Sequence, residues 1–337
     1  MNITRLRRFE TKLGECVHVI QEGAVADILQ QSKVRFVVLG IPEDIGVLGN
    51  YGTGGADTAW LPFLQSFCNV QSTDFFSGED ILILGQFDFS DVRALIGANA
   101  KNQDELVDAC RHAVEKIIDP EVEELVKLIA QSGKIPVVIG GGHNNAYPLI
   151  KGTAKGLQKA GRINTSQINV INADAHADYR VMEGRHSGNA FRYAKEDGFL
   201  HRYAIVGLQE NYNSQGMLDE LYSNINIHYT TYEDIFIREK VNLRQALVKA
   251  HSFTEEGYTG VELDLDSIQQ ALSSAAGSAG FTVLEARQYL SFLSHYAHIA
   301  YLHICEGATQ LANGQQNALT GKLICDLAID FMKSNKS

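Results

Sequence analysis

Residues 172–180 of the chain, NADAHADYR, place three side chains that can bind a metal ion at alternate positions. These side chains are Asp174, His176 and Asp178. Residues two positions apart in an extended segment share a face, so the three can converge on one point. A lone D-x-H-x-D motif is nevertheless more often a solvated strand end than a set of metal ligands. The rest of the chain has to decide between these two interpretations.

Three other apolar runs end in residues of the same chemical types. KIPVVIGGG runs into His143, TGVEL runs into Asp264 and Asp266, and IAYLHIC runs into Glu306. The two aspartates again lie two positions apart and share a face in an extended segment. Open α/β sheets bind ligands beyond the carboxyl ends of their strands, which is where these groups are expected to meet. The combination makes a metal site the better interpretation.

The chemistry of the expected ligands indicates two metal ions. We predict six ligands, which are His143, Asp174, His176, Asp178, Asp264 and Asp266. Oxygen ligands with a minority of nitrogen suit Mn²⁺ better than Zn²⁺. Six side chains are too many for one catalytic ion that needs open positions, but they suit two ions that share bridging carboxylates. Two such ions lower the pKa of a shared water enough to make it a nucleophile, so the site predicts hydrolysis.

The surrounding sequence predicts an α/β sheet that positions these residues. Eight short runs are solidly apolar rather than alternating, which is typical of parallel strands covered on both faces. Helical patterns lie at 104–118, 121–132, 242–253 and 284–298, with Pro120 separating the first two. Strands alternating with helices predict right-handed crossovers and a doubly wound sheet. The expected strands cover residues 34–41, 81–87, 134–141, 167–174, 203–208, 225–231, 259–266 and 299–306.

Composition narrows the class of protein. The chain has 337 residues, of which 45% are hydrophobic, enough for one large core. A formal net charge of −11 argues against nucleic acid or an anionic membrane as a partner. The five cysteines form no C-x-x-C pair, and no apolar stretch reaches the ~18 residues of a membrane span. We therefore expect one cytoplasmic globular domain without a disulfide framework.

The motifs also carry a family resemblance. The runs GGGH (140–143), DAHAD (174–178) and DLD (264–266) match the G-G-[DG]-H, D-A-H-x-D and D-x-D motifs of the ureohydrolase family. This family includes arginase, agmatinase and formimidoylglutamase, and the resemblance spans roughly residues 36–330. It implies a three-layer α/β/α fold with an eight-stranded, mainly parallel sheet. A single domain over residues 1–337 is then expected, with about 30 peripheral residues at its N-terminus.

The resemblance implies two Mn²⁺ ions per subunit and a role for each ligand. One ion would be held by His143, Asp174, Asp178 and Asp264. The other would be held by His176, Asp174, Asp264 and Asp266. A hydroxide bridging the ions would attack the sp² carbon of an amidine or guanidinium, and Glu306 would pair with the cationic nitrogens of the substrate. A nearby acid would protonate the departing amine.

Three features resemble formimidoylglutamases more than other members of the family. Gly142 stands where arginases and agmatinases usually have aspartate, Arg180 ends a run similar to D-L-R, and HSGNAFRYA (186–194) is similar to S-G-T-P-F-R-Q. N-formimidoyl-L-glutamate carries two carboxylates, for which Arg180 and Arg192 would be bidentate partners. Asn189 would be a further substrate-binding residue.

His186 is expected to be the catalytic acid or proton shuttle, because arginases and agmatinases place a histidine close to this position. Two alignments stay open, since the family's H-G can match His186-Ser187 or Ser187-Gly188. The leading function is a binuclear Mn²⁺ hydrolase that converts N-formimidoyl-L-glutamate into L-glutamate and formamide in histidine breakdown. Its partner would be a small amidine or guanidino amino acid, and a homo-oligomer is expected from the relatives.

Other functions stay open on the sequence alone. Arginase, agmatinase or guanidino-acid hydrolase activity would use the same metal chemistry and release urea, because the substrate's tail is bound by loops that the sequence describes poorly. A catalytically inert protein with the ureohydrolase fold would be marked by lost metal ligands, and all six are present. A metal-dependent deacetylase on a similar fold would need a His-His pair, and the chain has no such dipeptide.

Overall fold

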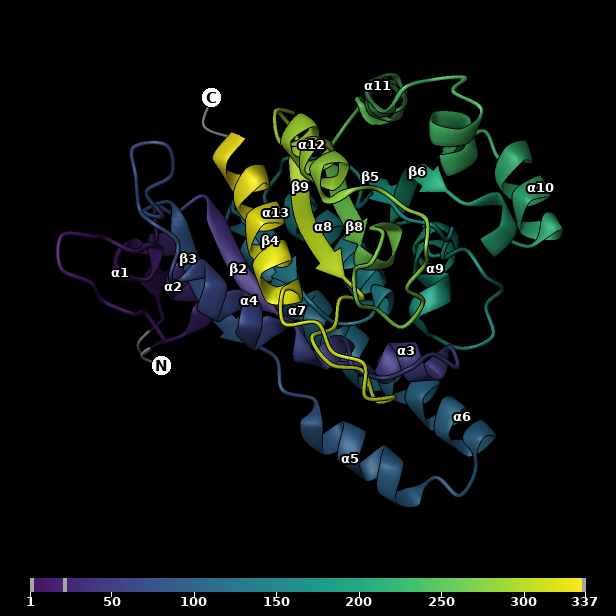
Figure 1. Ribbon diagram of the computed structural model, residues 1–337, viewed down its shortest axis with the longest axis horizontal. Helices are drawn as coiled ribbons and strands as arrows, with labels where there is room; N and C mark the ends of the chain where they lie inside the picture. Colours follow the sequence, from purple (N-terminus) through teal and green to yellow (C-terminus); the bar gives the residue numbers. More distant parts are fainter. Residues whose placement is uncertain (1–2, 21–22, 335–337) are drawn as a thin grey trace.

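One parallel sheet runs through the chain (Figure 1). The structure, a computed structural model, describes residues 3–20 and 23–334, and within them the sheet has nine strands. Their order is β1-β3-β2-β4-β9-β8-β5-β6-β7, and every neighbouring pair is parallel. The strands are β1 (His18–Val19), β2 (Phe36–Gly40), β3 (Ile81–Gln86), β4 (Ile135–Ile139), β5 (Ile168–Ala173), β6 (Leu200–Leu208), β7 (Ile227–Thr231), β8 (Thr259–Asp264) and β9 (Ile299–Cys305).

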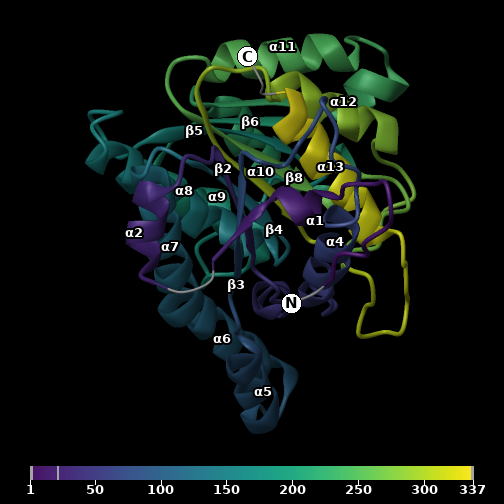
Figure 2. The same cartoon turned by 90° about the vertical axis from the view of Figure 1, so that its left-hand side faces the viewer.

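Helices cover both faces of the sheet. The α-helices are α1 (Leu13–Cys16), α2 (Val25–Gln31), α3 (Ile45–Gly49), α4 (Trp60–Phe67), α5 (Ser90–Asn99), α6 (Gln103–Ala113), α7 (Asp119–Gln131), α8 (Ala146–Lys159), α9 (Ala190–Glu196), α10 (Gln215–Ser223), α11 (Leu243–Thr254), α12 (Val283–Leu293) and α13 (Thr320–Ser334). Figure 2 shows α7 and α8 on one side of the sheet and α12 and α13 on the other. One hydrophobic core joins the strands to α4, α11, α12 and α13, and another joins them to α6, α7, α8 and α9. The expected three-layer α/β/α fold is confirmed.

All eight apolar runs expected to form strands do so, as β2 to β9. Every residue of β2, β5, β8 and β9 is buried, which is why these strands are mostly apolar and show no alternation of apolar and exposed polar residues. The expected number of eight strands is wrong by one. The additional strand β1 pairs with β3 at the edge of the sheet and consists of two exposed residues, His18 and Val19. Such a short exposed strand leaves no apolar run in the sequence.

The helical patterns are confirmed, with one difference around Pro120. The sequence predicts that this proline separates two helices, and that prediction is wrong. Instead α6 passes through a π-helical segment, Val114–Ile118, directly into α7, and Pro120 lies in the first turn of α7. The wider turn of the π-helical segment accommodates a residue that has no N–H group to donate.

The strand order brings the polar strand ends together. The chain passes from β4 to β5 across two positions of the sheet, and β8 and β9 later fill the gap between them. The four adjacent central strands β4, β9, β8 and β5 are therefore the ones followed by the polar motifs. Because all strands are parallel, their carboxyl ends open on the same edge of the sheet. This edge carries the site described below.

Two expectations about organisation have different outcomes. Among the described residues, no helix is long and apolar enough to cross a membrane. The single domain over residues 1–337 stays a prediction, although one sheet connects all the strands of the described part. Of the N-terminal segment expected to be peripheral, α1, β1 and α2 are described, and residues 1–2 and 21–22 lie outside the described ranges.

Candidate metal centre

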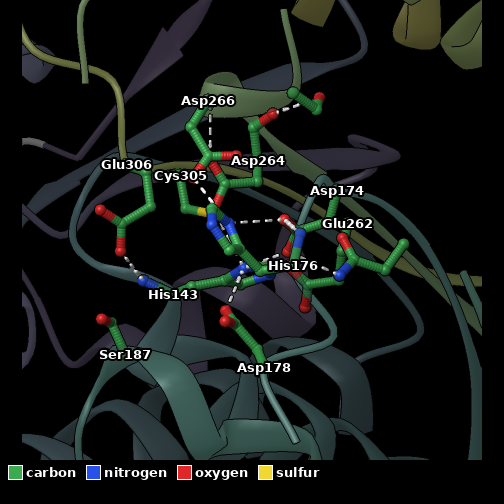
Figure 3. A network of polar contacts seen from close by, with 12 residues as sticks. His143, Asp174, His176, Asp178, Ser187, Glu262, Asp264, Asp266, Cys305 and Glu306 are labelled. Carbon is green, nitrogen blue, oxygen red and sulfur yellow. Dashed lines mark hydrogen bonds and ion pairs between the residues drawn. The ribbon is translucent and has the colours of Figure 1, made fainter. Parts of the chain in front are cut away.

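His143 lies at the centre of a first cluster of potential ligands. It follows β4 in a short 3₁₀ turn, His143–Asn145, and its imidazole is buried. Its Nδ1 atom lies 2.8 Å from Oδ2 of Asp178, 3.2 Å from Oδ2 of Asp174 and 3.3 Å from Oδ2 of Asp264. Figure 3 shows these carboxylates around the ring. Each of the four residues can offer one atom to a common point.

A second cluster shares Asp174 with the first. Nδ1 of His176 lies 3.1 Å from Oδ2 of Asp266 and 3.6 Å from Oδ1 of Asp174. Asp174 thus presents one oxygen to each cluster, which is the position of a bridging ligand. Asp264 lies in the first cluster only, and its Oδ1 atom accepts a hydrogen bond of 2.7 Å from the Asp266 N–H. All six expected ligands are brought together, while the bridging role of Asp264 stays a prediction.

The two clusters concentrate negative charge in a buried place. Burial raises the pKa of Asp264 well above its usual value, and the charges of Asp266 and Asp174 add to this effect. Burial also raises the pKa of Asp266, to about 6. For His176, burial disfavours the charged form, but the charges of Asp266 and Asp174 outweigh it and raise the pKa to about 12. The carboxylates therefore favour a cation among them.

Unpartnered atoms provide a test of whether metal ions fit. The Oδ1 atom of Asp266 is buried and makes no hydrogen bond within the described part of the chain, and the buried ring nitrogens of His143 have only ion-pair contacts with carboxylate oxygens. Buried polar atoms without partners are costly, so their retention calls for a ligand. Imidazole nitrogen together with several carboxylate oxygens is a donor set suited to divalent ions such as Mn²⁺. The residues present therefore fit two divalent ions.

The turn before His143 requires glycine and is held by Glu43. Gly141 has a φ angle of +78°, and a Cβ there would lie 2.7 Å from a backbone oxygen. A Cβ at Gly142 would lie 2.5 Å from a side-chain oxygen, so an aspartate does not fit without a shift. The buried Glu43 carboxylate accepts hydrogen bonds from the Gly142 N–H at 3.1 Å and from the Asn145 amide at 2.6 Å. The chain is thereby fixed just where His143 enters the cluster.

The loop over residues 174–180 is held in place by side chains from other strands and loops. The Asn213 side chain accepts a hydrogen bond of 3.0 Å from the Ala177 N–H, and the Tyr203 hydroxyl donates one of 3.0 Å to the Ala177 carbonyl. Asp178 has a φ angle of +45°, which is rare for a residue other than glycine. Such strain persists where the surroundings impose it, and here it turns the Asp178 carboxylate toward His143.

The clusters open onto a cavity of about 930 Å³, a size common for small-molecule sites. Four of the expected ligands line it, namely His176, Asp178, Asp264 and Asp266. Glu306 also lines the cavity, and its Oε1 atom accepts a hydrogen bond of 2.8 Å from the His143 N–H. Burial, followed by the charge of Asp264, raises the pKa of Glu306 well above its usual value. Glu306 thus lies where a cationic group of a bound molecule would meet it.

A comparison with known families decides the relationship. The model of the arginase family matches residues 34–332, most of the chain. The chain belongs to the arginase family. The expected ureohydrolase relationship and the expected class, a hydrolase of this family, are therefore confirmed.

Similar proteins agree with this assignment. The chain is 25% identical to the formimidoylglutamase of Corynebacterium efficiens over 335 residues, which cover 94% of this chain and 92% of that protein. Among solved structures, the formimidoylglutamase of Bacillus subtilis has a TM-score of 0.74 at 18% identity, covering 99% of this chain and 95% of that one. A Trypanosoma cruzi formiminoglutamase solved with Mn²⁺ has a TM-score of 0.71 at 17% identity, covering 96% and 98%. At these identities the solved structures establish the arginase fold.

The two arginines expected to bind substrate carboxylates both line the cavity, but their surroundings differ. Arg192 is already paired, because its two Nη atoms donate to the Glu220 carboxylate at 2.8 and 2.6 Å. Its Nε atom donates to the backbone carbonyls of Tyr179 and Arg180 at 3.1 and 2.8 Å. The Arg180 side chain is 51% exposed and lies 3.3 Å from Glu183. Arg180 is therefore the more available partner for a carboxylate, whereas Arg192 braces the cavity wall.

His186 and Asn189 are not among the residues that line the cavity within the described chain. The His186 imidazole is buried, its Nε2 atom lies 3.3 Å from Glu183, and burial lowers its pKa to about 4. Asn189 is also buried and accepts a hydrogen bond of 3.1 Å from the His186 N–H. Ser187 lines the cavity instead, which favours the alignment that places His186 one residue off. The roles expected for His186 and Asn189 therefore have no support in the geometry.

Sequence reasoning missed Arg185, whose guanidinium connects three parts of the site. The side chain is fully buried, and its Nε atom donates to Asp119 at 2.9 Å. Nη2 donates to the Asn144 carbonyl at 2.8 Å, beside His143, and Nη1 donates to Asn189 at 3.1 Å. Residues so far apart in the chain give no common signal, and a single arginine in a sequence is read by default as a surface cation.

We expect Arg185→Met to destabilise the protein by about 3–5 kcal/mol, because it leaves the buried Asp119 carboxylate without its partner. Urea unfolding would measure the change in the free energy of unfolding. The double variant Asp119→Leu with Arg185→Met is the matched control, since it removes both charges and should recover most of the loss. Equal stability of the single variant and the unmodified chain would contradict the prediction.

Proposed function

We propose that the chain is a binuclear metal hydrolase that cleaves the formimidoyl C–N bond of N-formimidoyl-L-glutamate. Water adds to the formimidoyl carbon, the bond to the glutamate nitrogen breaks, and that nitrogen takes up a proton, giving L-glutamate and formamide. One observation carries the proposal. Two ligand clusters that share Asp174 open onto a single cavity, which also contains Glu306 and Arg180. The similarity to the formimidoylglutamase of Corynebacterium efficiens supports the choice of substrate.

The proposed metal ligands divide between the two clusters. His143, Asp174, Asp178 and Asp264 would hold one ion, and Asp174, His176 and Asp266 would hold the other, with Asp264 as a proposed second bridge. When bound, the two ions supply a nucleophile by lowering the pKa of a water and balance the charge of the four aspartates. We propose Mn²⁺ because the donors are mostly oxygen.

The protein groups orient the substrate at this centre. The Glu306 carboxylate is fixed by the His143 N–H and would accept hydrogen bonds from the cationic nitrogens of the formimidoyl group. Arg180 would bind a carboxylate of the glutamate tail through its guanidinium. Arg192 would act indirectly, since its contacts with Glu220 and with two backbone carbonyls hold the segment that carries Arg180. We assign no residue as the acid that protonates the departing nitrogen, because His186 is not among the described residues that line the cavity.

Further expectations remain part of the proposal. A homo-oligomer, a cytoplasmic location and a role in histidine breakdown are expected from the family resemblance and the composition. A guanidino substrate is the alternative within the family, because Glu306 would accept hydrogen bonds from a guanidinium equally well. A catalytically inert protein is the alternative outside enzymes, and the assembled ligand clusters weigh against it.

The substrate is tested by product analysis. We expect Mn²⁺-loaded protein to release formamide from N-formimidoyl-L-glutamate and no urea from arginine, agmatine or 4-guanidinobutyrate. Arg180 would repel the distal amine of agmatine, whereas arginine and 4-guanidinobutyrate carry a carboxylate and test whether the site also accepts a guanidino group. Urea from a guanidino compound would keep the metal chemistry and reject the substrate. No product from any of the four would favour the inert alternative.

The metal assignment is tested by two substitutions. We expect Asp174→Asn to lose both ions and Asp266→Asn to lose one, because the first residue lies in both clusters and the second in one. Each variant should lower kcat/KM at least ~10³-fold, since the ions contribute several kcal/mol to the transition state. Elemental analysis of dialysed protein measures the number of metal ions bound per chain. Asp88→Asn, at an exposed position, is the control, and full metal content in Asp174→Asn would refute the assignment.

The tail-binding role of Arg180 is tested by Arg180→Met. We expect KM for N-formimidoyl-L-glutamate to rise roughly 10–100-fold with a smaller change in kcat, because one charge-assisted hydrogen-bond partner is lost. Arg180→Lys should give an intermediate value. Arg244→Met, an exposed arginine on α11, is the matched control. An unchanged KM in Arg180→Met would show that the tail is bound by other groups.

A further inference from the structure

A row of buried polar side chains crosses the middle of the sheet behind the candidate metal centre. The parallel register aligns Asn172 of β5 with Glu262 of β8, and Glu262 with His303 of β9. All three side chains are fully buried. A buried carboxylate in the centre of a sheet is destabilising unless its neighbours compensate its charge, so the presence of Glu262 there needs a physical reason.

Two residues of β9 stabilise the buried charge of Glu262. The Tyr301 hydroxyl donates to its Oε1 atom at 2.6 Å, and Nδ1 of His303 lies 2.7 Å from its Oε2 atom. The other ring nitrogen of His303 faces the Gly140 carbonyl at 3.3 Å. Each carboxylate oxygen of Glu262 therefore has a close polar contact, and these contacts fix the orientation of the carboxylate.

The fixed carboxylate faces His143. Oε2 of Glu262 lies 3.5 Å from Nε2 of His143, on the side of the ring opposite to the ligand cluster. The other nitrogen, Nδ1, faces Asp174, Asp178 and Asp264 at 2.8–3.3 Å. Figure 3 shows Glu262 and the three aspartates around the same imidazole. Nδ1 can bind a metal ion only when it carries no proton, which places the proton of the neutral ring on Nε2, toward Glu262.

We propose that Glu262 is a positioning residue that fixes the proton of His143 on Nε2 and thereby turns Nδ1 to the first metal ion. The inference rests on the proposed metal centre and adds a residue to it. It also makes the two metal sites unequal. His176, the imidazole of the other cluster, is 29% exposed and stacks on Tyr212 at 5.7 Å between ring centroids. The ion bound by His143 is then held by a buried and oriented ligand, and the ion bound by His176 by a more accessible one.

The test is calorimetric titration of metal-free protein with Mn²⁺. Loss of such an outer carboxylate typically weakens metal binding 10–100-fold. For Glu262→Gln we expect a loss of this size for one of the two ions and a change below about threefold for the other. Tyr301→Phe is the matched control. It removes a buried hydrogen bond from the same carboxylate but leaves its charge and its face toward His143, so both affinities should stay within about threefold.

The outcomes are distinct. Two unchanged affinities in Glu262→Gln would overturn the proposal. An equal loss at both sites, matched by Tyr301→Phe, would also overturn it, because a merely structural role of Glu262 would weaken both sites together. Failure of the unmodified chain to bind two ions would instead reject the proposed function, on which the inference depends.

A second measurement reads the proton position in the unmodified protein and uses a variant only to assign the signals. In unmodified protein loaded with Zn²⁺ as a diamagnetic ion, ¹⁵N NMR of the histidine rings reports which nitrogen carries the proton. His143→Asn identifies the signals of His143 by their disappearance. We expect a proton on Nε2 of His143, with the downfield shift of a hydrogen bond to a carboxylate. A proton on Nδ1, or an Nε2 proton that exchanges as rapidly as that of an exposed ring, would contradict the proposal.

Discussion

The crowding of four aspartates at one edge of the sheet, three of them buried and Asp178 partly buried, is the constraint on which the rest of the structure depends. Burial raises the pKa of Asp264 and of Asp266, and repulsion from neighbouring carboxylates adds to this effect. Within the described residues, the cations nearest to them are the rings of His143 and His176. A fold that keeps such a cluster without a larger positive charge loses stability. The two divalent ions of the proposed centre would offset this negative charge, so the same residues would account for both a cost in stability and a function.

The central strands deliver these groups with little freedom. Because β4, β9, β8 and β5 are adjacent and parallel, each contributes its first residues beyond the sheet to the same place. Loop residues alone would not hold the geometry, so buried polar groups hold the loops. Glu43 fixes the glycine turn before His143, Asn213 fixes the loop after β5, and Arg185 connects the turn after His143 to α7. These three buried polar groups thus support the site.

The sequence predicted those parts that depend on local pattern. Eight strands follow from apolar runs, and the six expected ligands follow from a two-residue spacing at strand ends, which brings side chains to one face whatever the rest of the fold does. β1 was missed because two exposed residues carry no pattern. The contacts of Glu262 with His303 and of Arg185 with Asp119 join residues 41 and 66 positions apart. They depend on strand register and helix packing, which no local spacing encodes.

The two arginines that line the cavity also differ in contacts that no local spacing in the sequence encodes. Arg180 and Arg192 are both arginines in family-like segments, and the sequence treats them alike. What separates them is Glu220, which lies on α10, 28 positions after Arg192, and takes both Nη atoms of that side chain. A guanidinium that is already in a bidentate pair has few N–H groups left for a ligand, and the Glu220 carboxylate offsets its positive charge in the field at the cavity. How closely a protein carboxylate pairs with each cavity arginine therefore decides how available that arginine is, and for Arg192 this pairing exists only once α9 and α10 are placed side by side.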